Sequence, residues 1–279
     1  MGKKQRRTWQ EAVVRFLQEK QHKKSLESDI WRFKYLNGAL GGKYLDEITI
    51  ETVNQIKEDY SATGVKNTTL NRMMGLLRSV LMLAMHEWEW LDKVPKVKLL
   101  QEPKRRVRFL KPEEIARLMQ ELPDHLKAMA KFSLATGLRE SNVTQLQWEQ
   151  VDMQRHCAWI YADQSKTGRA INVPLNDNAL EVVREQLGKH IKYVFVYEGH
   201  PVTRANNHAW RNALKRAGIE DFRWHDLRHC FASAHAMNGT PLHVLQALGG
   251  WESQEMVQRY AHLSSAHLLE FAGNSKTKL

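Results

Sequence analysis

The chain has 279 residues, of which 42% are hydrophobic and 26% are charged. This length suits one or two packed cores, and we expect two domains. No apolar run approaches the roughly 20 residues that cross a membrane, and the two cysteines, Cys157 and Cys230, lack the spacing of a disulfide framework or a zinc site. We therefore expect a soluble cytoplasmic protein that makes no membrane contact.

Positive charge is concentrated in the first part of the chain. The net charge is +11, and residues 1–111 carry 23 basic and 13 acidic side chains, whereas residues 112–279 carry 19 and 18. A field of this sign attracts polyanions, of which nucleic acid is the commonest. A solvated basic surface and contact with anionic lipid are the alternatives that charge alone leaves open.

The N-terminal part has the pattern of four amphipathic helices. Thr8 and Glu11 form a capping box that opens the first helix, and Gly38 with the following glycine pair ends the second. Apolar residues recur at helical spacing in each segment, so residues 1–92 predict a helical-bundle domain. The helices begin after Thr8, after Ser25, after Thr49 and near Thr68.

Residues 93–108 interrupt this pattern. Seven basic residues stand against one acid, Glu102, and prolines occupy positions 95 and 103. Such a segment predicts a basic interdomain linker that can cross a phosphate backbone, although many basic linkers are simply solvated. The candidate DNA contacts of this linker are Lys104, Arg105, Arg106 and Arg108.

The remainder, residues 109–279, predicts a mainly α-helical domain with a small β-hairpin or sheet. Pro112 opens a helix at its first turn, and a second helix ends at Gly137. The strongest β signals are two short runs joined through a turn that carries Lys166. These runs are Cys157–Tyr161 and Ala170–Val173, and a further strand-like run is Tyr193–Tyr197.

The segment WHDLRH places His225 and Arg228 three residues apart, on one face of a helix. That arrangement sets a proton carrier beside a fixed cation, although a capped helix start with a solvated arginine gives the same letters. His225, His229 and His235 also match the ligand spacing of one class of zinc protease. On an unbroken helix His235 lies roughly 80° from the direction of His225, and Asp226 replaces the general-base Glu, so we do not expect a zinc site.

Five motifs follow one another along the second part of the chain. They are ATGLRESNVTQLQW with Arg139, the hairpin lysine Lys166, HDLRHCFAS with Arg228, LGGW with Trp251, and MVQRYAHL with Tyr260. In this order they resemble the successive boxes of the tyrosine recombinase family, the phage-integrase type. The resemblance is close over residues 135–263, and the helical bundle and basic linker resemble the core-binding domain of that family more loosely.

The resemblance implies a two-domain clamp around duplex DNA. Residues 1–92 would be the core-binding domain, residues 93–108 the linker and residues 109–279 the catalytic domain. Arg139 and Arg228 would bind the scissile phosphate, because planar guanidinium groups match phosphate oxygens and stabilise the transition state. Tyr260 would attack in line and give a 3′-phosphotyrosine and a free 5′-hydroxyl, a reversible step that needs neither ATP nor metal nor another cofactor.

The resemblance also implies the supporting roles. Lys166 would protonate the departing 5′-oxygen, and His225 would move the proton of Tyr260 or hydrogen-bond the phosphate. Trp251 would donate its indole N–H to a phosphate oxygen. His229 would support these groups. Asn142 departs from the family, which commonly has an acid at this position, and the change bears on how firmly Arg139 or His225 is held.

The expected partners follow from the same resemblance. They are double-stranded DNA at attachment or core sites, three further copies of the chain in a homotetramer with a Holliday-junction intermediate, and DNA-bending accessory proteins near the nucleoid. A C-terminal helix, residues 266–271, would be exchanged between subunits or pack on its own domain. Only about seven residues precede the first helix, so the arm-binding module of many integrases is absent or has been removed.

Several functions share these motifs. The motif ATGLRESNVTQLQW resembles that of prophage integrases, which favours a prophage integrase that integrates and excises DNA. A dimer-resolution recombinase is the nearest alternative. A type IB topoisomerase uses similar chemistry but relaxes DNA alone. A catalytically idle DNA-binding protein would have little reason to keep Arg139, Lys166 and Tyr260 together.

Overall fold

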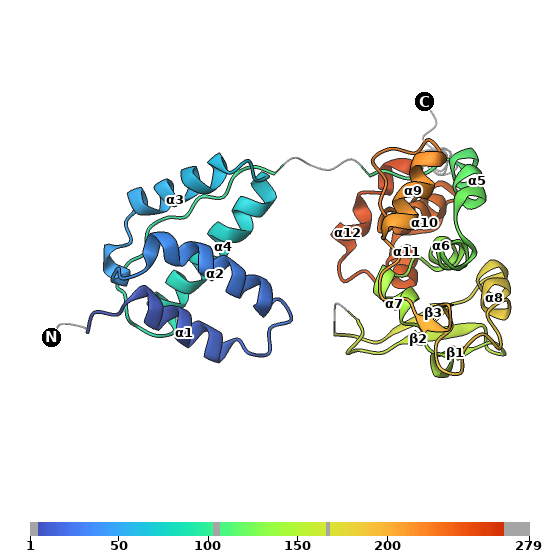
Figure 1. Cartoon of the computed structure of the whole chain (residues 1–279), viewed down its shortest axis with the longest axis horizontal. Helices are drawn as coiled ribbons and strands as arrows, with labels where there is room; N and C mark the ends of the chain where they lie inside the picture. The colour runs from blue at the N-terminus through green and yellow to red at the C-terminus, as the bar shows by residue number, and fades with distance from the viewer. Residues whose placement is uncertain (1–4, 103–106, 166–167, 265–279) are drawn as a thin grey trace, which may run out of the picture. The chain divides into compact units, whose positions relative to one another are not determined.

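The computed structural model describes residues 5–102, 107–165 and 168–264. It divides the chain into two compact units, Met1–Arg105 and Arg106–Leu279 (Figure 1). The first unit is helical, and the second is mainly helical with two small sheets. This composition confirms the fold class that the sequence predicts. None of the described helices is long and apolar enough to span a bilayer.

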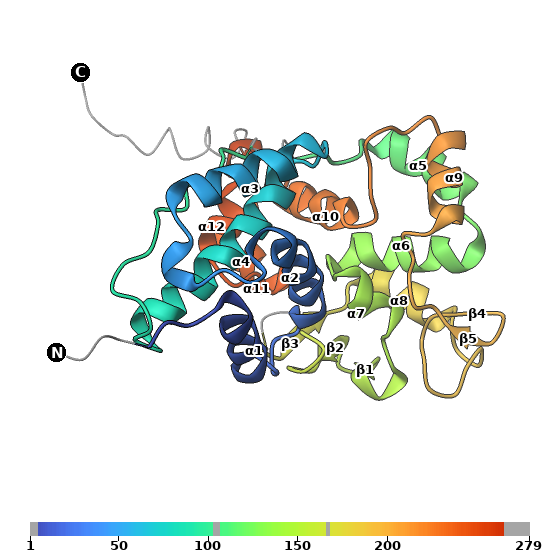
Figure 2. The same ribbon diagram turned by 60° about the vertical axis from the view of Figure 1, so that its left-hand side comes forward.

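The N-terminal unit contains four α-helices, and α4 contacts each of the other three (Figure 2). The predicted capping box is present at the start of α1, where the Glu11 amide donates to the Thr8 hydroxyl and the Thr8 amide donates to the Glu11 carboxylate. Each helix buries its apolar face in a common core. The elements are α1 (Trp9–Glu19), α2 (Leu26–Leu40), the 3₁₀ turn η1 (Leu45–Glu47), α3 (Ile50–Ala62) and α4 (Asn67–His86).

The second helix ends at the predicted glycine pair but not at Gly38. It passes through Gly38 and ends at Leu40, and the Gly41 amide then donates to the carbonyl of Asn37. Leu36 and Leu40 are both fully buried, and burying a leucine side chain contributes about 1.5–3 kcal/mol. That gain exceeds the roughly 1 kcal/mol that a glycine costs inside a helix, so the helix continues to its last core residue.

The first part of the predicted linker packs on the N-terminal unit. Val97 is buried in the core of the bundle. The Asn71 side chain accepts from the Leu100 amide and donates to the Leu100 carbonyl and to Glu102. The chain therefore follows the bundle well beyond residue 92, and the division between the units falls between Arg105 and Arg106.

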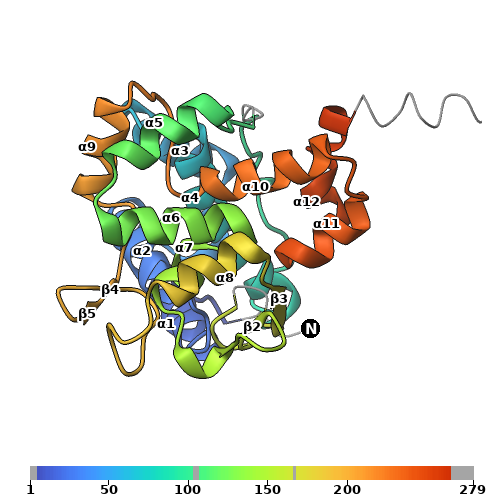
Figure 3. The ribbon, with the colours of Figure 1, turned by 90° about the vertical axis from the view of Figure 1, so that its right-hand side faces the viewer.

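The C-terminal unit is built around α6, which contacts α7, α8 and α10 (Figure 3). The helices before the sheet are α5 (Pro112–Glu121), α6 (Asp124–Thr136), α7 (Glu140–Thr144) and the turn η2 (Trp148–Gln150). Those after it are α8 (Asp177–Arg184), α9 (His208–Arg216), α10 (Asp226–Met237), α11 (Leu242–Gly249), α12 (Gln254–Gln258) and the turn η3 (Ala261–Ser264).

The predicted hairpin forms the larger part of a three-stranded antiparallel sheet in the order β1-β2-β3. Ile160 pairs with Ile171 and Ala158 with Val173, and all four side chains face the core. The two-residue strand β1 was not predicted, because it is too short to show alternation. The strands are β1 (Val151–Asp152), β2 (Cys157–Ile160), β3 (Ile171–Pro174), and the separate pair β4 (Val196–Tyr197) and β5 (His200–Pro201).

A small second apolar cluster lies at the other end of α10 from the main core. Phe231, Leu245, Val257 and Tyr260 belong to it, and they come from α10, α11, α12 and the residues that follow α12. The main core of the unit instead surrounds α6 and the sheet. The last predicted functional residue, Tyr260, is therefore held by a local cluster and not by the main core.

Candidate active site

A glycine turn between α6 and α7 presents Arg139. Gly137 ends α6 with a φ of 65°, and a Cβ at this position would lie 2.3 Å from the ring of Phe231. Both the left-handed backbone and the close approach of α10 require glycine here. Arg139 follows two residues later as the N-terminal cap of α7. The sequence ATGLR thus fixes this arginine beside α10.

Arg228 lies in the first turn of α10 and is only 4% exposed. Its Nη1 donates to the carbonyl of Gly137 at 2.6 Å, and its guanidinium carbon lies 4.0 Å from the ring centroid of Trp251. Burial, together with the charge of Arg139, lowers the pKa of Arg228 to about 9. Two guanidinium groups are therefore close enough to repel each other.

Both guanidinium groups keep unused hydrogen-bond donors. Arg139 Nη1 and Arg228 Nη2 are buried and have no hydrogen-bond partner among the described residues. Burial also lowers the pKa of Arg139. Buried polar atoms are nearly always hydrogen-bonded, so each exception calls for an explanation. Two adjacent cations with free N–H groups form a binding site for a multivalent oxyanion such as a phosphodiester.

Tyr260 follows α12 and is only 1% exposed. Its hydroxyl oxygen lies 2.5 Å from Nδ1 of His229, and its ring centroid lies 6.2 Å from that of Trp251. Burial raises the pKa of the Tyr260 phenol to about 12. The phenol therefore keeps its proton at neutral pH.

The histidine beside Tyr260 is His229 and not His225. Burial, with a contribution from His225, lowers the pKa of His229 to about 4. His225 caps the start of α10 and is exposed, and its ring centroid lies 5.6 Å from that of His229. The resemblance implies that His225 either moves the Tyr260 proton or hydrogen-bonds the phosphate. The residue one helical turn further along α10 faces the tyrosine-bearing segment instead.

The LGGW motif positions the Trp251 ring against Arg228. Gly250 ends α11 with a φ of 61°, and a Cβ at Gly249 would lie 1.8 Å from an atom of the Trp251 ring. The indole therefore lies directly over Gly249. The first glycine provides space for the ring, and the second provides the left-handed turn.

We expect Gly249→Ala to displace Trp251 and to lower both stability and strand cleavage. The free energy of unfolding should fall by about 1–3 kcal/mol, the usual cost of overpacking. Thermal unfolding and cleavage of a nicked DNA substrate measure the two effects. Gly38→Ala is the matched control, because its Cβ meets nothing within 4 Å, and it should raise stability by about 0.5–1 kcal/mol. Unchanged cleavage by the Gly249 variant would contradict this role for the glycine.

Asn142 connects the arginine-bearing helix α7 to the β2–β3 hairpin. Its Nδ2 donates to the carbonyl of Gln164 at 3.2 Å, and the Gln164 side chain accepts from Gln150 at 2.7 Å. The two glutamines were not singled out in the sequence, which carries no pattern that marks them. Lys166, the predicted general acid on this hairpin, lies outside the described residues.

Glu140 is a further residue that the motifs did not reveal. Its Oε1 accepts from the amides of Ala205 and Asn206 at 2.7 and 2.8 Å. Through these two bonds the Glu140 carboxylate holds the loop before α9 at the start of α7. A glutamate directly after the motif arginine was visible in the sequence, but its partners lie 65 residues away.

The other predicted contacts have mixed outcomes. Arg108 donates to Glu114 at 2.7 Å and to the carbonyl of Phe109 at 2.7 Å. The remaining predicted linker contacts, Lys104, Arg105 and Arg106, lie outside the described residues, as does the C-terminal segment 266–271.

Within the described ranges no group of His, Cys, Asp or Glu could hold a metal ion. His229 contacts Tyr260, and His235 contacts Thr240 at 3.0 Å, so the zinc-protease spacing does not bring these rings together.

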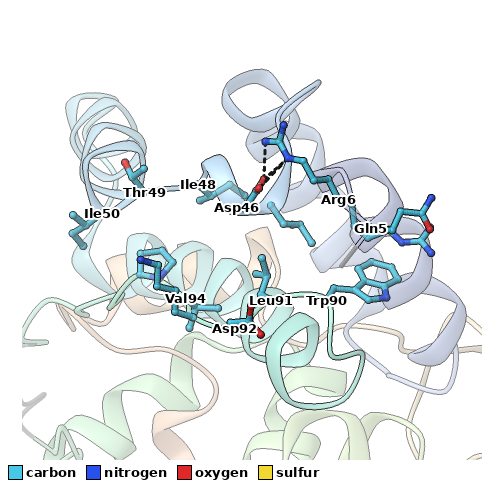
Figure 4. Close-up of a pocket in the computed structure, with 14 residues that line it drawn as sticks. Gln5, Arg6, Asp46, Ile48, Thr49, Ile50, Trp90, Leu91, Asp92 and Val94 are labelled. Atoms are coloured by element: carbon cyan, nitrogen blue, oxygen red, sulfur yellow. Dashed lines mark hydrogen bonds and ion pairs between the residues drawn. The ribbon is translucent and has the colours of Figure 1, made fainter. Parts of the chain in front are cut away.

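A pocket of about 970 Å³ lies in the N-terminal unit (Figure 4). Trp90, Leu91 and Val94 contribute apolar side chains to it, and Arg6 at its edge pairs with Asp46 at 2.8 Å. Because this arginine is paired, its charge is not free for a phosphate. The arginines with free hydrogen-bond donors, Arg139 and Arg228, lie in the C-terminal unit, as do His229 and Tyr260.

The chain matches known proteins over most of its length. The family model described as "Phage integrase family" matches residues 108–267. The integrase of Salmonella phage P22 is 42% identical over an alignment 308 positions long, gaps included, which covers 95% of this chain and 79% of that one.

Two solved structures show the same fold. The Tn1549 transposon integrase in complex with transposon right end DNA has a TM-score of 0.78 at 16% identity and covers 94% of this chain and 98% of that one. A lambda integrase tetramer bound to a Holliday junction has a TM-score of 0.73 at 18% identity, with 89% and 78% covered.

The fold and the arginine–tyrosine site define a tyrosine recombinase, a DNA strand-exchange enzyme. The chain belongs to the phage integrase family. This membership confirms the resemblance that the five sequence motifs carry.

Proposed function

We propose that the chain is a site-specific recombinase that cleaves and rejoins DNA strands through a 3′-phosphotyrosine at Tyr260 and acts in prophage integration and excision. The observation that carries the proposal is the pair of buried, unpartnered guanidinium donors of Arg139 and Arg228 in the same site as a phenol. A phosphodiester supplies the anion that these donors lack. The 42% identity to a phage integrase favours integration over dimer resolution.

Each side chain has a task in this reaction. Arg139 and Arg228 bind the non-bridging oxygens and stabilise the charge that develops in the transition state. The aromatic ring of Trp251 holds the Arg228 guanidinium in place. Lys166 protonates the departing 5′-oxygen, and exposed His225 hydrogen-bonds the phosphate. The roles of Arg139, Arg228 and Trp251 are supported by the geometry of the described residues, and those of His225 and Lys166 by the motif order.

The proposed substrate is double-stranded DNA at a core site, bound by a homotetramer of this chain. The excess of basic side chains in residues 1–111 supports binding to a phosphate backbone, and the lambda integrase structure on a Holliday junction supports the tetramer. DNA-bending accessory proteins and association with the nucleoid in the cytoplasm complete the proposal. No metal or nucleotide takes part in the phosphotyrosine chemistry.

The test is covalent capture on a nicked suicide substrate. The purified protein should form an adduct that resists denaturation, in the presence of a metal chelator, and peptide mapping should locate the DNA on Tyr260. Recombinant products between two sites would distinguish a recombinase from a topoisomerase, which gives only relaxed DNA. Salt-sensitive binding without an adduct, on a DNA site that the protein protects from nuclease, would favour an idle DNA-binding protein.

We expect Asn142→Asp to reduce cleavage even though the family commonly has an acid here. Asn142 donates a hydrogen bond to the Gln164 carbonyl, and a carboxylate cannot donate. The half-buried carbonyl would face a negative charge, at a cost of about 1–3 kcal/mol, and the hairpin that carries Lys166 would shift. Cleavage of a substrate with a 5′-bridging sulfur measures the effect, because a thiolate leaves without an acid. The defect should be much smaller on this substrate, and an equal defect on both substrates would contradict the explanation.

A further inference from the structure

The hydrogen bond between His229 and Tyr260 is the starting observation. His229 Nδ1 and the Tyr260 hydroxyl oxygen are 2.5 Å apart, and the two residues lie 31 positions apart in the chain. The phenol is 1% exposed, so bulk water has little access to its proton. A proton that leaves this hydroxyl must pass to a neighbouring side chain.

The protonation states allow Tyr260 to donate this hydrogen bond. Burial raises the pKa of Tyr260 to about 12 and lowers that of His229 to about 4. At neutral pH the phenol therefore carries a proton and the imidazole is uncharged. In the tautomer that carries the ring proton on Nε2, Nδ1 of His229 accepts from the Tyr260 hydroxyl.

We propose that His229 accepts the phenolic proton of Tyr260 when a strand is cleaved and returns it when the strand is rejoined. The inference rests on the proposed role of Tyr260 as nucleophile and assigns the base for that step. His225 is exposed, and its ring centroid lies 5.6 Å from that of His229. It is therefore free to contact the phosphate.

The cleavage step balances with this assignment. The O–H bond of Tyr260 breaks, and its proton goes to Nδ1 of His229. The phenolic oxygen forms a bond to phosphorus, and the bond from phosphorus to the 5′-oxygen breaks with its electron pair on that oxygen. The 5′-oxygen takes a proton from the ammonium of Lys166 or from water. In rejoining, a 5′-hydroxyl gives its proton to the Lys166 amine or to water as its oxygen bonds to phosphorus. The bond from phosphorus to the phenolic oxygen breaks, and the imidazolium of His229 returns its proton to that oxygen.

The charges around His229 indicate how DNA would trigger this transfer. Asp226 favours the protonated ring, whereas His225, Arg259 and Arg223 disfavour it. Arg139 and Arg228 add positive charge to the site in the absence of DNA. A bound phosphodiester brings a negative charge into the site, and we expect this charge to favour the imidazolium form of His229. The tyrosine thus stays protonated until a phosphate occupies the site.

The decisive variant is His229→Asn. The Asn side chain keeps a hydrogen-bond acceptor near the position of Nδ1 but is not basic. Cleavage of the nicked substrate should slow about 100-fold, the lower end of general-base effects. His235→Asn is the matched control, because His235 lies on the same helix, has a pKa lowered by burial and contacts Thr240 instead of the phenol. Its cleavage rate should stay within about twofold of wild type.

A more acidic nucleophile separates a base from a structural support. Fluorotyrosine at position 260 loses its proton more readily, so it should restore cleavage by the His229→Asn variant at least tenfold. The rate of this variant with ordinary tyrosine should also rise about tenfold per pH unit between pH 7 and 9, because only the phenolate then attacks. The wild-type rate should change far less over this range.

The outcomes distinguish the proposals. No adduct from the wild-type chain would overturn the role of Tyr260 itself. A wild-type adduct with a fully active His229→Asn variant, or with a slow variant that fluorotyrosine does not rescue, would overturn only the role of His229. Should the Asn variant fail to fold by circular dichroism, His229→Gln is measured in the same way.

Discussion

Tyr260→Phe should bind DNA as tightly as the wild-type protein and form no covalent adduct. The substitution removes only the hydroxyl, while the ring remains in its cluster with Phe231 and Val257. His229 then loses its donor, and a buried acceptor without a partner costs about 1–3 kcal/mol. We therefore expect a slightly lower unfolding temperature together with a complete loss of cleavage. Denaturing gel electrophoresis of the suicide-substrate reaction measures the adduct.

The matched control is Tyr197→Phe. Tyr197 is 50% exposed on β4 and lies outside the apolar cluster that contains Tyr260. Its hydroxyl should therefore not affect adduct formation. An adduct from the Tyr260 variant that equals the wild type would assign the nucleophile to another residue. Loss of DNA binding in that variant would show that the hydroxyl has a structural role that the buried ring does not explain.

Local patterns predicted most of the fold because each signal acts within a few residues. The Thr8–Glu11 capping box, the alternation of Ala158 and Ile160, and the glycine at position 137 are formed by neighbours in the chain. The local pattern was wrong in predicting a helix end at Gly38, because the burial of Leu40 outweighs the low helix propensity of glycine. Tertiary packing decided that boundary, and propensity alone could not.

The site was predicted as a set of residue types but not as a set of contacts. The motif order identified Arg139, Arg228 and Tyr260 as partners, and the structure places Arg228 against Trp251 and against the Gly137 turn that precedes Arg139. Which histidine meets Tyr260 depends on where the segment after α12 returns to α10. That return is a long-range packing event, and the five-residue spacing HDLRH does not encode it.

The burial of the two arginines has an energetic cost that the sequence does not reveal. Unpaired buried charge destabilises a folded protein. Arg228 has a partner carbonyl for one nitrogen, and its other terminal nitrogen has none among the described residues. A site that binds phosphate keeps this cost in the free protein because the anion removes it on binding. Catalytic sites commonly carry such local instability.

We expect Arg228→Met to cleave DNA at least about 1000-fold more slowly than wild type, as for other arginines that stabilise a phosphoryl transition state. The same substitution should not lower the unfolding temperature at pH 7. Burial lowers the pKa of Arg228 from its ordinary value to about 9 in the folded protein. The folded state therefore disfavours the cation, and this cost is present in full below pH 9 and falls as the pH rises above 9.

The magnitudes decide the sign of the stability change. A buried charge without a counter-ion costs several kcal/mol, and this penalty exceeds the about 1–3 kcal/mol lost when the Gly137 carbonyl gives up its donor. Methionine keeps the apolar stem against Trp251. Inorganic phosphate should raise the unfolding temperature of the wild-type protein, because an anion that binds only the folded state stabilises it, and it should have a much smaller effect on the variant.

Arg216→Met is the matched control for this experiment. Arg216 is exposed and pairs with Glu121 at 2.6 Å, so its removal should change neither cleavage nor the response to phosphate by a measurable amount. Thermal unfolding in matched buffers with and without phosphate, followed by the suicide-substrate assay, gives both readouts. A strongly destabilised Arg228→Met variant, with a phosphate response equal to that of the wild type, would mean that Arg228 supports the fold and that the anion binds elsewhere.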